Sequence, residues 1–212
     1  MSADRRFHPF RLLTRLEVAL PVARPLTRRL ARRRFDALAP TWDRIRGGHP
    51  DSTLALEAAL HAIRAVDPRP PRRILDVGTG TGQAAFVLRD LFPDAEIDAI
   101  DTAPAMIETA RAKPGADGIR FAVADGAHLP FPDATFDLVV LLCVQPFATE
   151  LGRVVRPGGW VLFAYAMGPT TPIYFAPGTL ASALRRAGFE PATHGRTGPG
   201  EWTVARRAPG RA

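Results

Sequence analysis

The sequence predicts an α/β fold built on a doubly wound, mostly parallel sheet with an antiparallel edge at its C-terminal end. Three observations predict it: short apolar runs alternate with helix-prone stretches, a glycine-rich turn follows the first run, and three successive runs end in an aspartate. Such alternation is typical of sheets whose parallel strands are joined by helices on both faces. The 212 residues are enough for one domain of this kind with a substantial core.

Positive charge is concentrated at the N-terminus. Residues 1–34 carry a net charge of +8, whereas residues 35–212 are close to neutral at −1. We therefore divide the chain into a basic helical arm, 1–34, and a folded domain, 35–212. The arm is predicted to form two short helices broken by Pro21 and Pro25, the second of which covers residues 27–38.

Three interpretations of the arm remain open. Its arginines can form a solvated face while its leucines pack on the domain, or it can contact an anionic membrane surface or a nucleic acid. Leucines at helical spacing and only two aromatic residues, Phe7 and Phe10, favour the membrane over nucleic acid. Cys143 is the only cysteine and no signal peptide is evident, so we expect a cytoplasmic protein, peripheral to the membrane if the arm binds it.

The first helix of the domain is expected over residues 53–66, with Asp51 or Ser52 as its cap. Its apolar side chains recur at helical spacing on one side, which predicts that this side packs on the sheet. These side chains are Leu56, Ala59, Leu60 and Ile63.

The glycine-rich turn follows the first predicted strand, residues 74–77. Gly78, Gly80 and Gly82 let the chain reverse sharply and bring backbone N–H groups close to a ligand at the start of a helix predicted over 83–91. Asp76 stands at the end of the strand, where ligands bind in open α/β sheets. A fixed carboxylate there suits a ligand with a cationic group, such as an amino-acid ammonium, better than a bare pyrophosphate.

Asp101 and Asp125 follow the same pattern at the ends of the second and third predicted strands, residues 96–101 and 119–124. Asp101 lies about 20 residues past the glycine turn, where a carboxylate can accept hydrogen bonds from both hydroxyls of a ribose. Pro104 opens the helix between the two strands. One aspartate at a strand end is usually a turn or helix cap, but three at successive strand ends predict a ligand site.

The remaining elements complete the sheet. Residues 136–142 are apolar on both faces and therefore predict a central strand. We further expect a short helix over 148–155, a strand over 160–166, a helix capped by Thr179 and stopped by Gly188, and a closing hairpin of residues 189–193 and 202–206.

Four motifs appear in order along this part of the chain. They are Ile74-Leu75-Asp76-Val77-Gly78-Thr79-Gly80-Thr81-Gly82, then Ile100-Asp101 with Pro104-Ala105-Met106, then Asp125-Gly126-Ala127-His128-Leu129-Pro130-Phe131-Pro132-Asp133 running into Phe136-Asp137, and finally Val154-Val155-Arg156-Pro157-Gly158-Gly159. Together they resemble the class I S-adenosylmethionine-dependent methyltransferases of the ubiquinone/menaquinone-biosynthesis-like group (methyltransferase type 11). The resemblance covers residues 35–208 as a fold. It implies a seven-stranded Rossmann-like sheet, S-adenosyl-L-methionine as cofactor, and methyl transfer to a small-molecule acceptor.

The resemblance also implies which residues bind the cofactor. Asp76 would hold the methionine ammonium beside the glycine turn, Asp101 the ribose hydroxyls, and Asp125 the adenine amino group. Met106 would lie against the adenine, and the two leucines at the tip of the fourth strand would lie near the sulfonium. The full set is Asp76, Gly78, Thr79, Gly80, Gly82, Asp101, Thr102, Met106, Asp125, Gly126, Ala127, Leu141 and Leu142.

The chain departs from the family pattern after the fourth strand. Only residues 143–156 precede Pro157-Gly158-Gly159, roughly two helical turns fewer than is usual for the group. The acceptor pocket is therefore expected to depend on residues 35–50, 144–147 and 167–177. No general base and no metal site is predicted, and His128 is only the nearest candidate for a base.

Three other functions remain open. The protein can be a methyltransferase acting on RNA or protein through the basic arm, or a non-catalytic cofactor-binding protein, which the short segment after the fourth strand favours. It can also be a NAD(P)-dependent oxidoreductase, because Gly80-x-Gly82-x-x-Ala85 fits a loose dinucleotide motif. The oxidoreductase is less favoured because the carboxylate of Asp76 would repel a pyrophosphate.

Overall fold

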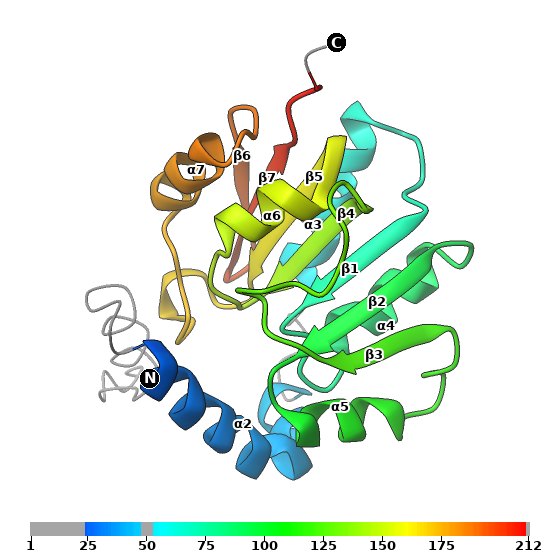
Figure 1. Cartoon of the computed structure of the whole chain (residues 1–212), viewed down its shortest axis with the longest axis vertical. Helices are drawn as coiled ribbons and strands as arrows, with labels where there is room; N and C mark the ends of the chain where they lie inside the picture. Colours follow the sequence, from blue (N-terminus) through cyan, green and yellow to red (C-terminus); the bar gives the residue numbers. More distant parts are fainter. Residues whose placement is uncertain (1–23, 48–52, 211–212) are drawn as a thin grey trace.

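A seven-stranded sheet forms the centre of the protein (Figure 1). The computed structural model describes residues 24–47 and 53–210. The strands are β1 (Arg73–Val77), β2 (Glu96–Asp101), β3 (Ile119–Val123), β4 (Phe136–Leu142), β5 (Val155–Tyr165), β6 (Thr193–Thr197) and β7 (Gly200–Arg206). The helices are α2 (Arg24–Gly47), α3 (Leu54–Val66), α4 (Gln83–Leu91), α5 (Pro104–Arg111), α6 (Ala148–Val154) and α7 (Pro177–Arg186), with one 3₁₀ turn, η2 (Gly168–Thr170).

The strand order is β3-β2-β1-β4-β5-β7-β6. Strands β1 to β5 pair in parallel, and β7 pairs antiparallel with both β5 and β6. The predicted fold class, a doubly wound and mostly parallel seven-stranded sheet with an antiparallel C-terminal edge, is therefore confirmed.

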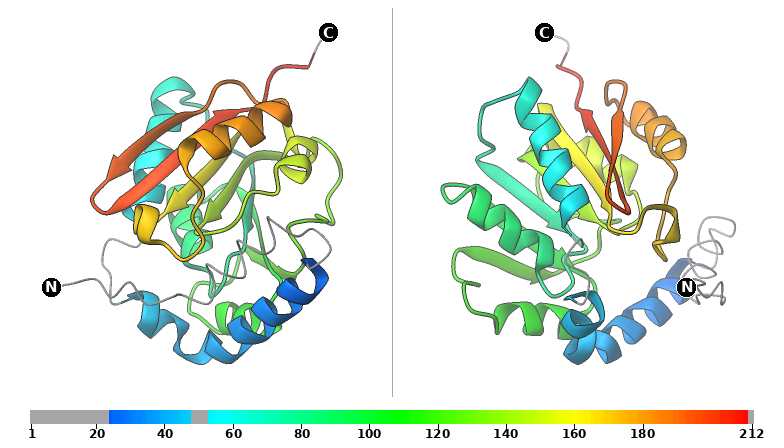
Figure 2. Two further views of the ribbon diagram at one scale, coloured as in Figure 1. Left: turned by 90° about the vertical axis from the view of Figure 1, so that its left-hand side faces the viewer. Right: turned by 180° about the vertical axis from the view of Figure 1, so that it is seen from behind.

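Successive side chains of the central strands build two cores, one on each face of the sheet. Ile74 and Val140 enter the core beneath α3, α4 and α5. Leu75 and Val139 enter the core beneath α6 and α7. Figure 1 shows the side of the sheet that α6 covers, and the right-hand view of Figure 2 shows the side that α3 and α4 cover. Because β4 is buried on both faces, its prediction as a central strand is confirmed.

The sheet changes direction between β1 and β4. From β1 the chain moves outward to β2 and β3, whereas from β4 it moves the other way to β5. Loops that follow two such strands diverge, and ligands of doubly wound sheets bind outside the carboxyl ends of the strands at this point. The candidate site therefore centres on the loops after β1 and β4.

Helix α2 runs unbroken from Arg24 to Gly47 past the carboxyl ends of the strands and packs on α5 (Figures 1 and 2). The prediction that this helix ends at residue 38 is wrong. Apolar side chains at helical spacing pack on the start of α5, and this packing supports the helix through Pro40. The predicted boundary at residue 34 falls inside α2. The first predicted helix of the arm lies outside the described residues.

Two other boundaries differ from prediction. Helix α7 begins at Pro177 with Ala176 as N-cap, not with Thr179, because the fixed φ of proline suits the first turn. The predicted stop at Gly188 is confirmed by its φ of +84°. The first strand of the hairpin is β6, not residues 189–193, since Pro191 has no N–H for a ladder.

Strand β5 and helix α3 also begin at other residues than predicted. Strand β5 begins at Val155, which pairs with Phe136 ahead of a local irregularity. The N-cap of α3 is Thr53, and the predicted caps Asp51 and Ser52 lie outside the described residues. Within the described ranges, no helix is long and apolar enough to cross a bilayer.

Candidate functional site

The glycine turn joins β1 to α4 and is tied to the neighbouring strand. Gly78, Gly80 and Gly82 have φ values of +71°, +54° and +91°, which L-residues with side chains rarely adopt. The N–H groups of Gly78 and Thr79 donate to the carbonyl of Ile100 at 2.8 and 2.9 Å. The turn is therefore held at the tip of β2, where Asp101 is located.

Asp76 is the least satisfied polar residue of the site. Its side chain is 0% exposed, and neither carboxylate oxygen has a hydrogen-bond partner among residues 24–47 and 53–210. Burial raises its pKa to about 7, and the negative charge of Asp101 adds to this rise. The hydroxyl of Thr79 and the backbone N–H of Ala85 offset part of the rise, although neither makes a hydrogen bond of normal geometry with the carboxylate. In its charged form a buried carboxylate of this kind needs a donor or a cation that the described residues do not supply.

Asp101 holds two backbone segments together. One of its carboxylate oxygens accepts from the N–H of Gly80 at 2.9 Å, and the other accepts from the N–H of Ala103 at 2.9 Å. Burial raises the pKa of Asp101, and these N–H donors offset part of the rise. The carboxylate therefore orders the glycine turn in addition to the ribose-binding role that the sequence predicts.

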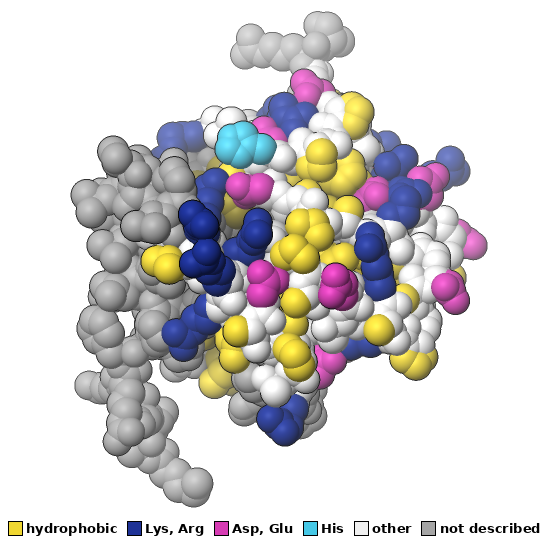
Figure 3. Space-filling view, turned by 60° about the horizontal axis from the view of Figure 1, so that its bottom comes forward, with side chains coloured by type: hydrophobic (Ala, Val, Ile, Leu, Met, Phe, Trp, Pro, Cys, Tyr) yellow, Lys and Arg dark blue, Asp and Glu magenta, His cyan; other side chains and the backbone are white. Residues whose placement is uncertain are grey.

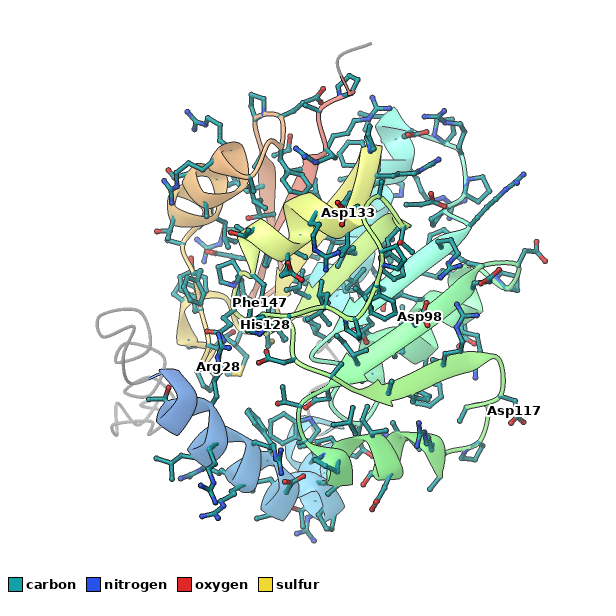
Figure 4. All side chains as sticks on the ribbon, in the orientation of Figure 1. Arg28, Asp98, Asp117, His128, Asp133 and Phe147 are labelled. Carbon is teal, nitrogen blue, oxygen red and sulfur yellow. The ribbon has the colours of Figure 1, made fainter. Side chains whose placement is uncertain are left out.

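The carboxylate of Asp125 already has partners within the chain. Its Oδ1 accepts from the N–H of Ala127 at 2.9 Å, and its Oδ2 pairs with Nη1 of Arg28 on α2 at 3.2 Å. The Nδ1 atom of His128 lies 3.9 Å from the same Oδ2. Figure 4 shows Arg28, His128 and Phe147 together near the carboxyl edge of the sheet, far from Asp117 at the opposite end of β3. The carboxylate predicted to read an adenine amino group thus already pairs with a cation.

Helix α2 covers the part of the site that is predicted to bind adenosine. Met106 is buried in a cluster with Phe35, Ala39 and Trp42. A Cβ atom built on Gly80 would lie 3.4 Å from Nε1 of Trp42, so this indole faces the turn. These three residues of α2 were not in the predicted cofactor set, and their one sequence signal is the apolar spacing i, i+4, i+7.

Hydrogen bonds pin α2 at two further points. Asp36 accepts from the N–H of Ala105 at the start of α5 at 3.1 Å. Asp43 accepts from the hydroxyl of Thr81 in the glycine turn at 2.6 Å and pairs with Lys113 at 2.8 Å. Side chains along α2 therefore contact the segments that follow β1, β2 and β3.

The short loop after β4 folds back on the same edge. A Cβ atom on Gly78 would lie 2.5 Å from a methyl group of Val144, and one on Gly126 would overlap Phe147. Cys143 starts this loop with a φ of +60°. Leu141 and Leu142, predicted to lie near the sulfonium, are buried at the end of β4, whereas Thr102 is exposed. All thirteen predicted residues thus lie at the carboxyl ends of β1 to β4 or in the segments that follow them.

The end of β5 and the loop after it place two tyrosines beside this site. Their rings, Tyr165 and Tyr174, meet edge to face with centroids 5.2 Å apart. The hydroxyl of Tyr165 donates to the carbonyl of Val144 at 3.3 Å, and that of Tyr174 to Glu201 at 2.6 Å. Burial and the neighbouring carboxylate raise the pKa of Tyr174 to about 12, which makes it a donor and a poor base near neutral pH. Glu201, buried at the start of β7, was not predicted.

Relatives of known name match the same region. Residues 74–159 match the family described as a methyltransferase domain. The chain is 40% identical over 138 residues to the demethylmenaquinone methyltransferase of Thermus thermophilus, covering 59% of this chain and 60% of that protein. It is 37% identical over 150 residues to the malonyl-[acyl-carrier protein] O-methyltransferase of Halorhodospira halophila, covering 66% and 48%. The chain thus spans less than two thirds of the length of these curated relatives.

Solved structures share the fold. A SAM-dependent methyltransferase from Aquifex aeolicus has a TM-score of 0.61 at 21% identity, covering 82% of this chain and 98% of that one. The [4+2]-cyclase SpnF has a TM-score of 0.64 at 19% identity, covering 85% and 96%. At these identities the likeness concerns the fold alone. By the sequence of residues 74–159 the chain is similar to the methyltransferase-domain family, and its sheet has the same Rossmann-like fold as these solved structures.

Proposed function

We propose that this protein is an S-adenosyl-L-methionine-dependent methyltransferase that acts on a small-molecule acceptor. The observation that carries the proposal is Asp76, a fully buried carboxylate without a hydrogen-bond partner in the described ranges, beside a glycine turn. An α-ammonium group supplies both the positive charge and the N–H donors that this carboxylate lacks. The names of its relatives, a demethylmenaquinone methyltransferase and malonyl-[acyl-carrier protein] O-methyltransferases, support methyl transfer as the reaction.

The residues at this edge fit the cofactor. The positive φ values of the three glycines bring the backbone of the turn to the start of α4, and Val144 and Phe86 lie where Cβ atoms on Gly78 and Gly82 would be. Asp76 would hold the ammonium, Asp101 the ribose, and Asp125 the adenine amino group once Arg28 moves aside. Bound S-adenosylmethionine supplies an electrophilic methyl group on sulfur.

The chain itself would position the two reactants and exclude water from them. Helix α2 and the loop after β4 enclose the edge from two sides, through Trp42 and Val144. Holding two reactants in line accounts for a large share of the rate that such sites provide. We assign no general base, because His128 is exposed and lies beside Asp125, away from the buried end of β4.

Calorimetric titration tests the proposal. S-adenosylmethionine, S-adenosylhomocysteine and NADH are titrated into the wild type, Asp101→Ala and the control Asp117→Ala, which changes an exposed aspartate at the other end of β3. We expect both sulfur ligands to bind the wild type and the control but not Asp101→Ala. Binding of NADH without either sulfur ligand would instead make the protein an oxidoreductase.

The titration also separates the remaining alternatives. The [4+2]-cyclase SpnF shows that this fold is not limited to methyl transfer. If the sulfur ligands bind but no methyl group reaches any small molecule, RNA or protein offered, the protein is a cofactor-binding protein without transferase activity. If RNA accepts the methyl group, deleting residues 1–34 should abolish RNA binding, and affinity should fall steeply with salt.

We propose that residues 1–34 bind an anionic membrane surface on its cytoplasmic side. Support comes from the net charge of +8 of these residues and from the leucines at helical spacing among them. Nucleic acid is the second candidate, since arginine clusters bind phosphates equally well.

A further inference from the structure

The two sides of α2 differ in chemistry. Between residues 27 and 44 the helix carries six arginines against two aspartates. One side packs on the domain through Thr27, Ala39 and their neighbours. The opposite side is exposed and carries Arg29, Leu30, Arg33, Pro40 and Arg44. At 100° per residue these five positions fall on one stripe, about 180° from the packed side.

This outer stripe of α2 (Arg29, Leu30, Arg33, Pro40 and Arg44) is a surface that attracts anions. A cluster of Lys and Arg side chains stands at the left of Figure 3, on the face where α2 comes forward. The domain itself is close to neutral, so the charge is a property of this helix and not of the whole surface. Near an anionic membrane surface each arginine contributes about 1 kcal/mol of binding free energy.

The apolar content of the stripe favours lipid over nucleic acid. Leu30 is 46% exposed among the arginines, as expected for a side chain that can enter a lipid interface. Both aromatic residues of α2, Phe35 and Trp42, belong to the buried cluster with Met106, so neither offers a stacking platform to a base.

The inner side of the same helix closes the candidate cofactor site. Asp36 holds the start of α5, Trp42 faces Gly80, and Asp43 holds the hydroxyl of Thr81. Because both sides belong to one continuous helix, a partner that holds the outer stripe also holds the contacts of Asp36, Trp42 and Asp43 in place, while the side chain of Arg28 can still rotate away from Asp125.

We propose that α2 docks on an anionic lipid surface through its outer stripe, and that docking strengthens cofactor binding by keeping the inner side closed. The second half of this proposal rests on the proposed function. Linkage requires the reverse effect as well: a bound cofactor strengthens docking by the same factor. The membrane thereby acts as an activating partner of the site.

Vesicles test the docking half. The full chain is sedimented with vesicles of phosphatidylglycerol and phosphatidylcholine, and with phosphatidylcholine alone. We expect binding only to the anionic vesicles. Each arginine near such a surface contributes roughly fivefold, so Arg29→Gln with Arg33→Gln should weaken binding about thirtyfold. The control exchanges the exposed pair Arg185 and Arg186 at the end of α7 for Gln and should bind like the wild type.

The second measurement addresses the coupling. S-adenosylhomocysteine is titrated into the protein in solution and into the protein on saturating anionic vesicles. We expect it to bind at least about fivefold more tightly to the protein on the vesicles. The gain should vanish in Arg29→Gln with Arg33→Gln, whose affinity in solution should match that of the wild type.

Three results would overturn the proposal. One is equal vesicle binding by both double variants, another is binding to RNA but not to lipid, and the third is an S-adenosylhomocysteine affinity that vesicles leave unchanged. Failure of the proposed function looks different, since no sulfur ligand would then bind in solution while docking on vesicles could persist.

Discussion

Asp76→Asn separates the role of the buried carboxylate in binding from its effect on stability. Folding raises the pKa of this carboxyl group from 3.8 to about 7 because its charged form loses water. Below both values the group is protonated in the folded and unfolded states, and its contribution does not change with pH. As the pH rises through this window, the unfolded state ionises first, so the wild type loses stability, by about 4 kcal/mol in full. Asparagine stays neutral and does not show this loss.

Urea unfolding at about pH 5 and about pH 8 measures the effect. We expect Asp76→Asn to gain roughly 2–3 kcal/mol relative to the wild type between these two conditions. The same variant should bind S-adenosylhomocysteine at least about a hundredfold more weakly, because the ligand ammonium would be buried without its counter-charge.

The control for this variant is Asp98→Asn. Asp98 is a buried aspartate of β2, opposite Leu75 of β1, that pairs with Arg73 and Arg120. Its loss should lower stability and leave ligand affinity unchanged. Identical pH dependence in the wild type and Asp76→Asn, or unchanged affinity in the latter, would refute the reasoning.

Further variants probe other parts of the site. Arg28→Ala frees the carboxylate that it pairs with, so S-adenosylhomocysteine should bind up to about fivefold tighter by calorimetry; weaker binding would mean that Arg28 supports the ligand. Gly82→Ala places a side chain at a φ of +91° and within 2.7 Å of Phe86, so urea unfolding should show a loss of about 1–3 kcal/mol. Gly178→Ala, with open space around it, should cost nothing, and equal losses would contradict this account of the turn. Tyr174→Phe removes the hydrogen bond to the buried carboxylate of Glu201, which still pairs with Arg196 at 3.4 Å, and should lower stability by about 1–3 kcal/mol; an unchanged unfolding midpoint would argue against that hydrogen bond.

The sheet and its first helices could be predicted because local signals mark them. The bounds of β2, β4 and α4 match the expected ranges residue for residue. Each begins or ends at an aspartate, a glycine or a change of apolar period, and these signals act within a few residues. The three aspartates could be placed at one edge for the same reason, since parallel strands bring their carboxyl ends together.

The contacts of α2 could not be predicted in this way. Arg28 and Asp125 are 97 positions apart, and Asp36 and Ala105 are 69 apart. No local pattern names the partner of an arginine in a run of arginines, and such a run reads equally well as a solvated face. The pairing of Tyr174 with Glu201 was missed for a related reason, because it joins a loop to a strand whose start was placed two residues late.

The short loop after β4 has a consequence for how the protein can diversify. Val144 rests on the turn that would hold the methionine end, Phe147 rests on Gly126 at the adenine end, and the carbonyl of Val144 anchors Tyr165 on the acceptor side. In a longer loop separate segments can make these three contacts, so that one contact can vary while the others are conserved. Here the five residues 143–147 make all three contacts. A substitution selected for a new acceptor therefore also changes the hold on the methyl donor, and such changes should arise together with compensating changes at the glycine turn.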